Sequence, residues 1–191
     1  MPGAEPAGGL QLWSGDGLTV RLETWAAAAR IDEAAMARGR ERWLLQLAED
    51  EATLGGVLLD LAERRATAAL RTRVGRSHTG AIEVVGADFV AIRIVSGVVL
   101  LPHASLTMVR PGPGARPVVG DRVVRSEVRF VEVVRELAAD REQVRVVVDG
   151  GEVVSGTLHS VGVDVLALRA DGDPPATVHV PVTAVSEVGL G

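Results

Sequence analysis

Residues 74–94 read VGRSHTGAIEVVGADFVAIRI, and residues 150–170 read GGEVVSGTLHSVGVDVLALRA. The second stretch repeats the first at an offset of 76 residues, and the gap-free alignment extends back to cover 57–94 and 133–170. Apolar residues, turn glycines and one Asp recur at matching positions in both copies. A repeat of this kind indicates one small structural unit present twice. The sequence therefore predicts two copies of a single small domain.

Alternating side chains predict strands in both copies. Over 68–74, Ala68, Leu70, Thr72 and Val74 alternate with Ala and Arg, and over 144–148 every second residue is Val. A period of two is typical of a strand with one buried side. Glycines at 75, 150 and 151 supply the hairpin turn that follows, because Gly adopts positive φ at little cost.

Glycine and Asp positions shared by the copies mark the later strands. These structural repeat positions are Gly80, Gly86, Asp88, Gly156, Gly162 and Asp164. The first glycine of each set falls inside the second predicted strand, where Gly indicates a bend or a bulge, which a small barrel needs in order to close. The shared Asp either accepts hydrogen bonds from backbone N–H groups in the turn before strand three or serves as a base-contacting or catalytic group. Strands four and five are expected near 98–101, 106–109, 178–180 and 184–188, on either side of Pro102 and Pro181.

The predicted fold class is mostly β with α, in which a long N-terminal helix precedes two five-stranded barrels, each led by a helix of its own. The expected segments are a flexible tail over 1–23, a helical segment over 24–56, repeat 1 over 57–110, a linker over 111–125 and repeat 2 over 126–191. Leucines at 44, 47, 54, 58 and 61 form one helical stripe. Gly55-Gly56 either breaks that helix or marks a close approach of two backbones. Ser126 is the expected cap of the second repeat's helix.

Bulk composition limits the classes of function. The chain has no Cys, which excludes disulfides and thiolate metal sites. No run of about 18 apolar residues and no signal peptide can be recognised, so we expect a cytoplasmic protein without a membrane partner. The net charge of −5 is uneven: residues 57–110 carry seven Arg against four acids, and residues 126–191 carry five Arg against eleven. The copies are therefore expected to differ in partner.

The first copy carries the clearest family resemblance. Val74-Gly75, Gly80, Ile82-Glu83, Asp88-Phe89-Val90 and His103-Ala104-Ser105 resemble the Sm-like fold, the small SH3-like barrel of Sm, LSm and bacterial Hfq proteins. His103 falls where Hfq has the His of its Lys-His motif, and Pro102 replaces the Lys. The chain has no Asn, the residue with which Sm and LSm proteins read a base. The resemblance covers about 55 residues in each copy.

The resemblance implies assembly through sheet edges and contact with RNA. Sm-like domains pair strand five of one barrel with strand four of the next, as exposed sheet edges tend to do. Two barrels in one chain would satisfy each other in this way, or a homo-oligomer would close a ring. The stripe from Leu44 to Leu61 is a second candidate interface.

Basic residues of repeat 1 are the candidate nucleic-acid contacts. They are Arg71, Arg73, Arg76, Arg93 and Arg110, together with His103 from the Hfq match. Arginine pairs bidentately with phosphate, and phosphate contacts supply most nonspecific affinity for nucleic acid. Single-strand binders also stack bases on aromatic side chains, and repeat 1 offers only Phe89. Solubility alone would also explain a charged strand face.

No catalytic constellation is recognisable, so we expect a protein that is not an enzyme and that holds no cofactor or metal. The four His residues lack metal-ligand spacing and are expected at surface or edge-strand positions. The first functional hypothesis is a regulatory module that binds single-stranded RNA through repeat 1. The second is a protein–protein or homo-oligomeric assembly scaffold that keeps the barrels without binding RNA. A small-ligand-sensing barrel is the third, and no pocket for it can be read from the sequence.

Overall fold

A computed structural model describes residues 15–191 of the chain, with side chains from residue 19 onward. The chain divides into two units, residues 1–47 and 48–191. The first contains most of helix α1 (Gly15–Asp50), which spans 36 residues. It begins before the expected start at residue 24, because residues 18–23 contain neither Gly nor Pro to stop it. The part of the predicted tail over 1–14 lies outside the described residues.

The predicted leucine stripe is divided between two helices. Helix α1 ends at Asp50, and helix α2 (Leu54–Glu63) begins after a short break. Leu44 and Leu47 are exposed on α1, whereas Leu58 and Leu61 are fully buried. The stripe from Leu44 to Leu61 is therefore not one helix face, because its first part is exposed on α1 and Leu58 and Leu61 of α2 are in the core.

The two glycines at the start of α2 mark a close approach of backbones. The break lies before them, at 51–53. Thr53 caps α2, since its Oγ1 accepts a hydrogen bond from the Gly56 N–H at 3.0 Å. A Cβ on Gly56 would overlap the carbonyl oxygen of Gly120. Of the two alternatives for Gly55-Gly56, the close approach is the one observed.

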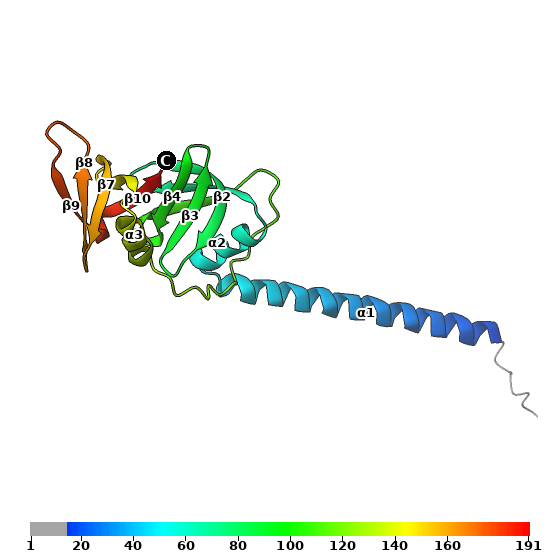
Figure 1. Ribbon diagram of the computed structural model, residues 1–191. Coiled ribbons are helices and arrows are strands. Elements are labelled where there is room, and N and C mark those ends of the chain that lie inside the picture. Colours follow the sequence, from blue (N-terminus) through cyan, green and yellow to red (C-terminus); the bar gives the residue numbers. More distant parts are fainter. Residues whose placement is uncertain (1–14) are drawn as a thin grey trace, which may run out of the picture. The chain divides into compact units, whose positions relative to one another are not determined.

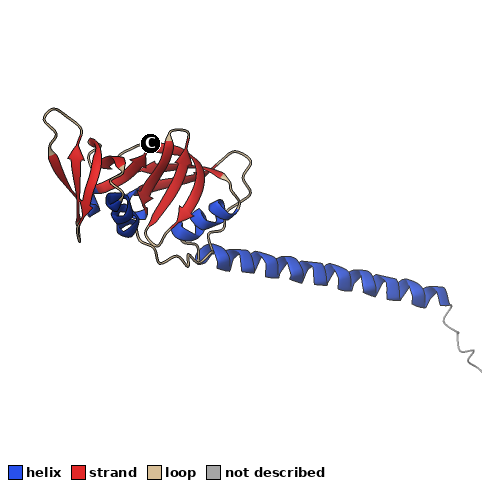
Figure 2. Cartoon of the chain, viewed as in Figure 1, coloured by secondary structure: helices blue, strands red, loops and turns tan. Residues whose placement is uncertain are grey.

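All ten strands of the second unit form one open antiparallel sheet (Figures 1 and 2). The strands are β1 (Thr67–Thr72), β2 (Ser77–Val85), β3 (Phe89–Ile94), β4 (Gly97–Pro102), β5 (Leu106–Pro111), β6 (Gln143–Val148), β7 (Val153–Val161), β8 (Val165–Ala170), β9 (Thr177–Pro181) and β10 (Val185–Leu190). Their order is β5-β1-β2-β3-β4-β10-β6-β7-β8-β9. Each half of the sheet thus has the same internal order, with the fifth strand beside the first. The expected five strands per repeat are present, and the sheet that they build is not closed.

Equivalent irregularities curve the two halves. A Cβ on Gly80 would overlap the carbonyl oxygen of Arg93, and a Cβ on Gly156 would overlap that of Arg169. Both glycines are therefore required by close strand approach. The bulges themselves lie further along the strands, between Ile82 and Val84 in β2 and between Leu158 and Ser160 in β7.

The two halves share part of their core. One apolar cluster lies between α2 and the strands of repeat 1. The other lies under α3 (Phe130–Ala139) and recruits Phe89, Ala91 and Leu100 from repeat 1. The rings of Phe89 and Phe130 lie 6.4 Å apart. Strand β3 is consequently buried on both faces over Phe89–Ile92.

Candidate functional site

The junction between the repeats is a strand pairing within one chain. Strand β10 of repeat 2 lies antiparallel to β4 of repeat 1, with Leu100 opposite Val188, Val99 opposite Gly189 and Val98 opposite Leu190. This is a fifth strand beside a fourth strand. Of the two arrangements expected from the sequence, the structure shows the one in which the repeats of one chain pair with each other.

A buried charged cluster ties the same two repeats together. Glu187 of β10 is only 1% exposed, and its carboxylate lies 2.6 Å from His78 Nε2 and 2.8 Å from Arg76 Nε. Burial alone raises the pKa of Glu187, but its hydrogen bond to His78 and the charges of His78 and Arg76 outweigh burial and lower that pKa overall. His78 is buried, so the expectation of a surface or edge position is wrong for this residue.

A second ion pair crosses the junction at its rim. Arg73 Nε lies 2.7 Å from Asp149 Oδ1, and Arg73 Nη2 donates a hydrogen bond to the carbonyl of Thr183 at 3.2 Å. Arg73 thus contacts two segments of repeat 2. Its guanidinium is engaged in holding the repeats together.

Helix α3 begins on the turn before β3. Its first N–H, that of Phe130, donates to Asp88 Oδ1 at 2.7 Å, and the Ala87 N–H donates to the carbonyl of Val128 at 2.9 Å. The carboxylate of Glu132 accepts the Arg129 N–H at 2.8 Å. Asp88 therefore caps a helix of the other repeat, and Ser126, which lies four residues before the helix, does not cap it.

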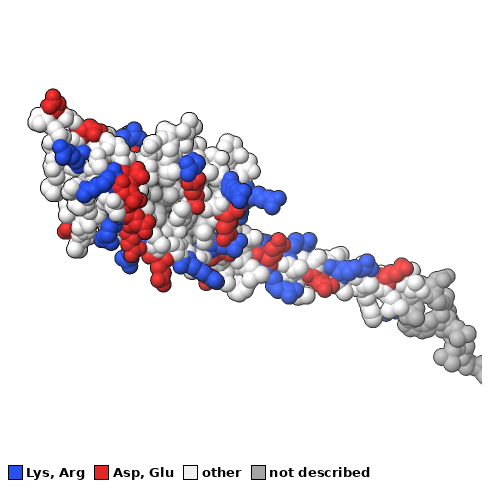
Figure 3. Space-filling view, viewed as in Figure 1, with Lys and Arg blue, Asp and Glu red and all other residues white. Residues whose placement is uncertain are grey.

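The other predicted basic residues differ in their partners. Arg93 pairs with Glu83, with Nη2 and Oε2 at 2.9 Å, on the exposed face of β2 and β3. Arg71 and Arg110 lie on neighbouring strands at positions 71↔108 and 69↔110, and no ion pair is found for either among the described residues. The predicted basic face is therefore reduced to these two guanidinium groups, of which that of Arg110 donates from Nη2 to Met108 Sδ at 3.8 Å. Acidic and basic side chains lie next to each other over the sheet on the face in view (Figure 3).

His103 lies on the short helical turn between β4 and β5. Its backbone N–H donates to the carbonyl of Asp88 at 2.8 Å. Burial lowers the pKa of its imidazole, and the Asp88 carboxylate opposes that change only in part. The ring nitrogen Nε2 is buried without a hydrogen-bond partner in the part of the chain that the structure describes.

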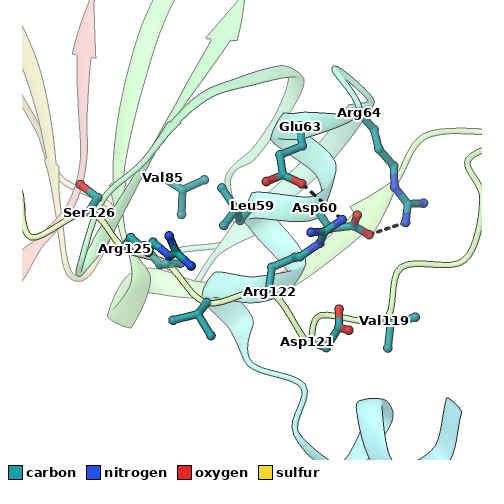
Figure 4. Close-up of a pocket in the computed structure, with 12 residues that line it drawn as sticks. Leu59, Asp60, Glu63, Arg64, Val85, Val119, Asp121, Arg122, Arg125 and Ser126 are labelled. Carbon is teal, nitrogen blue, oxygen red and sulfur yellow. Dashed lines mark ion pairs between the residues drawn. The ribbon is translucent and has the colours of Figure 1, made fainter. Parts of the chain in front are cut away.

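An open cleft of about 760 Å³ lies between α2 and the linker (Figure 4). Four of its six charged side chains form two ion pairs. Arg64 lies 2.7 Å from Asp60, and Arg122 lies 3.7 Å from Glu63. With Asp121 and Arg125, which complete the set, the cleft is lined by three arginines and three carboxylates, so its formal charge is balanced.

Two sheet edges remain free. They are β9, which corresponds to β4, and β5, which corresponds to β10.

Among residues 19–191, no group of three or more His, Asp or Glu is arranged to hold a metal ion. No helix in the described part of the chain combines the length and the apolar character needed to cross a bilayer. Comparison with protein-family models, curated proteins and solved structures found no match for this chain.

Sequence reasoning missed Glu187, the residue at the centre of the junction. The register shifts at matching places, between Arg71 and Thr72 of β1 and between Val185 and Glu187 of β10. Glu187 therefore takes the position that Met108 has in β5. The presence of Glu in one repeat where the other has Met indicates that the two equivalent strand positions have different neighbours. His78 in place of Val154 is the matching signal on β2.

Proposed function

We propose that this protein is a non-enzymatic assembly scaffold built from two Sm-like barrel repeats, whose copies join head to tail through the free sheet edges. The observation that carries this proposal is the β4–β10 pairing inside the chain. That pairing leaves one strand of each kind, β9 and β5, with its outer edge unpaired among the described residues. An exposed strand edge offers unpaired N–H and C=O groups to another chain, and a second copy carries the matching edge.

The repeat fixes the register of the proposed pairing. Because β9 and β5 correspond to β4 and β10, His179 of one copy lies opposite Val109 of the next, and Val178 lies opposite Arg110. Such a contact is heterologous, so repetition produces either a closed ring or an open filament.

The side chains on and near the free edges suit this contact. Where Glu187 meets His78 inside the chain, the equivalent positions are Met108 on β5 and Val154 on β7, and both side chains are partly buried. An apolar pair would therefore replace the buried charged pair at the contact between copies.

Binding of single-stranded RNA is the second candidate function. Arg71 and Arg110 support it, since neither is paired with a carboxylate in the described structure. The engagement of Arg73, Arg76 and Arg93 with acidic groups weighs against it. If RNA is a ligand, Arg71→Ala should weaken its binding and flatten the salt dependence.

Engineered cysteines test the head-to-tail contact, and the cysteine-free chain makes the experiment clean. The variant Val109→Cys/His179→Cys carries one thiol on each free edge. Directly opposed residues of antiparallel strands have Cα atoms about 4.5–5.5 Å apart, within reach of a disulfide. Mild oxidation should give a ladder of covalent multimers on a non-reducing gel.

Two controls give the result its meaning. Leu100→Cys/Val188→Cys, the equivalent pair inside the chain, should give a cross-linked monomer. Single-cysteine variants should give no product larger than a dimer. A purely monomeric 109/179 variant, with the internal control cross-linked, would contradict the proposal. Nucleic acid that co-purifies with the wild type and survives moderate salt would favour the second candidate.

A further inference from the structure

We infer that Asp164 of one copy caps helix α2 of the next copy, so that the contact between copies includes a helix socket as well as paired strands. The inference rests on the proposed head-to-tail assembly. It names a contact that edge-strand pairing alone does not require.

The junction inside the chain shows what such a socket looks like. The turn before β3 holds the start of α3 by three contacts. Asp88 Oδ1 accepts the Phe130 N–H at 2.7 Å, the Ala87 N–H donates to the carbonyl of Val128 at 2.9 Å, and the Phe89 ring packs on the Phe130 ring. A carboxylate here satisfies an N–H that the helix itself leaves unpaired.

Equivalent groups are present a second time, at the turn before β8 and at the start of α2, where they do not contact each other within the described chain. At the offset of 76, Asp88 corresponds to Asp164, Phe89 to Val165 and Phe130 to Leu54. Asp164 is exposed, and its carboxylate has no hydrogen-bond or ion-pair partner among the described residues. The backbone of Asp164 makes the same hydrogen bond as the backbone of Asp88. The Asp164 carbonyl accepts the Val182 N–H at 2.8 Å, and the Asp88 carbonyl accepts the N–H of His103, the residue equivalent to Val182.

Exposure separates the occupied socket from the empty one. Phe130 is 3% exposed, whereas its counterpart Leu54 is 40% exposed. Phe89 is 1% exposed, whereas its counterpart Val165 is only partly buried. The Leu54 N–H is the first of α2, and it has no acceptor among the described residues. The Leu54 N–H and side chain are thus available at the start of α2, and the carboxylate that would accept the N–H is available in the turn at Asp164.

The occupant of the empty socket is a second copy of this chain. The argument is continuity with the internal junction: the free edge β9 lies beside the Asp164 turn, as β4 lies beside the Asp88 turn. A partner strand that pairs with β9 as β10 pairs with β4 brings its own α2 to Asp164. Strand and helix would therefore dock together.

Loss of the cap should weaken the association measurably. We expect Asp164→Ala to raise the dissociation constant between copies about fivefold to tenfold in sedimentation velocity, the usual cost of losing an N-cap side chain. Glu142→Ala removes one exposed carboxylate from the same repeat and should leave the association unchanged. Thermal unfolding should show both variants to be folded.

A photo-cross-linking amino acid at position 54 tests the contact directly. In a mixture of isotopically labelled and unlabelled copies, it should join residue 54 of one copy to the 163–165 turn of another. Asp164→Ala should reduce that product.

The two proposals can fail separately. Cysteines at 109 and 179 that cross-link copies, without the 54 to 163–165 product and with an unchanged dissociation constant for Asp164→Ala, would overturn the socket and leave the strand pairing intact. A chain that stays monomeric at every concentration would overturn both.

Discussion

At the scale of single residues, both repeats place an arginine in the left-handed backbone conformation, which is unfavourable for a residue with a Cβ. Arg65 follows α2 with φ 50°, and Arg141 follows α3 with φ 56°. In both copies the N–H of the following residue closes the helix end, because Ala66 donates to the carbonyl of Leu61 and Glu142 to the carbonyl of Leu137. This is the helix-ending motif in which Gly is usual, because a Cβ is strained in the left-handed region.

Arg65→Gly should therefore stabilise the protein. We expect the free energy of unfolding to rise by about 0.5–1 kcal/mol, less than the full left-handed penalty because Gly also makes the unfolded chain more flexible. For a chain of this size the midpoint should rise by roughly 1–4 °C in calorimetry. Arg65→Ala keeps the Cβ and serves as the matched control. Equal gains from both variants would show that the arginine side chain, and not the backbone, is the source.

At the scale of structural elements, the strand pattern could be predicted from the sequence and the helix ends could not. Alternation over 68–74 places Ala68, Leu70 and Thr72 inside, as observed. Val147 breaks the same rule, because it is fully buried on the side that the period assigns to solvent. It lies opposite Glu187, at the junction with repeat 1. Alternation of apolar residues identifies the sheet face that is buried within one repeat. It does not show that contact with the other repeat also buries the opposite face.

Capping explains a similar failure for α3. Ser126 has the right chemistry for a cap, but Asp88 from the other repeat reaches the Phe130 N–H instead. The acceptor is 42 residues away in sequence. No local pattern around Ser126 contains that information. The shared Asp was expected to accept N–H groups of its own turn, whereas the donor to Asp88 lies in the other repeat.

The buried cluster of β2 and β10 should behave as a coupled unit. His78→Val leaves the Glu187 carboxylate buried with one partner fewer, and we expect a loss of about 3 kcal/mol in the free energy of unfolding. The double variant His78→Val/Glu187→Met copies the residues at the equivalent positions of the other repeat, Val154 and Met108. It should be more stable than the sum of the two single losses predicts, by about 1–2 kcal/mol in urea unfolding. Strictly additive losses would mean that the two side chains do not interact.

Acid should weaken the same junction. The folded protein holds the pKa of Glu187 below its ordinary value of 4.5, so the native state favours the charged form. The resulting stabilisation is complete above pH 4.5 and is lost as the pH falls from there through the lowered value. Unfolding midpoints of the wild type should consequently fall more steeply below pH 4.5 than those of Glu187→Gln. Parallel curves for the two proteins would contradict this assignment.

At the scale of the whole molecule, charge determines which edges pair. If β10 met the free edge β9 of another copy, Glu187 would face Val154 and Glu152 in place of His78 and Arg76. A buried carboxylate beside a second carboxylate is strongly unfavourable. In the proposed assembly this repulsion would disfavour β10 at the edge of β9 and would leave β5 as the matching edge.

A charge exchange at the free edges should switch assembly off and on. Val178→Arg places an arginine opposite Arg110 of the next copy in the proposed register, and like charges that face each other across strands are unfavourable by up to about 1 kcal/mol. Association should weaken roughly fivefold in sedimentation velocity. Adding Arg110→Asp to the same chain creates an opposite-charge pair and should restore wild-type association. Arg110→Asp alone faces an unchanged valine and should assemble normally. If the double variant stays as weak as Val178→Arg, positions 178 and 110 are not opposed, and the register derived from the internal junction is incorrect.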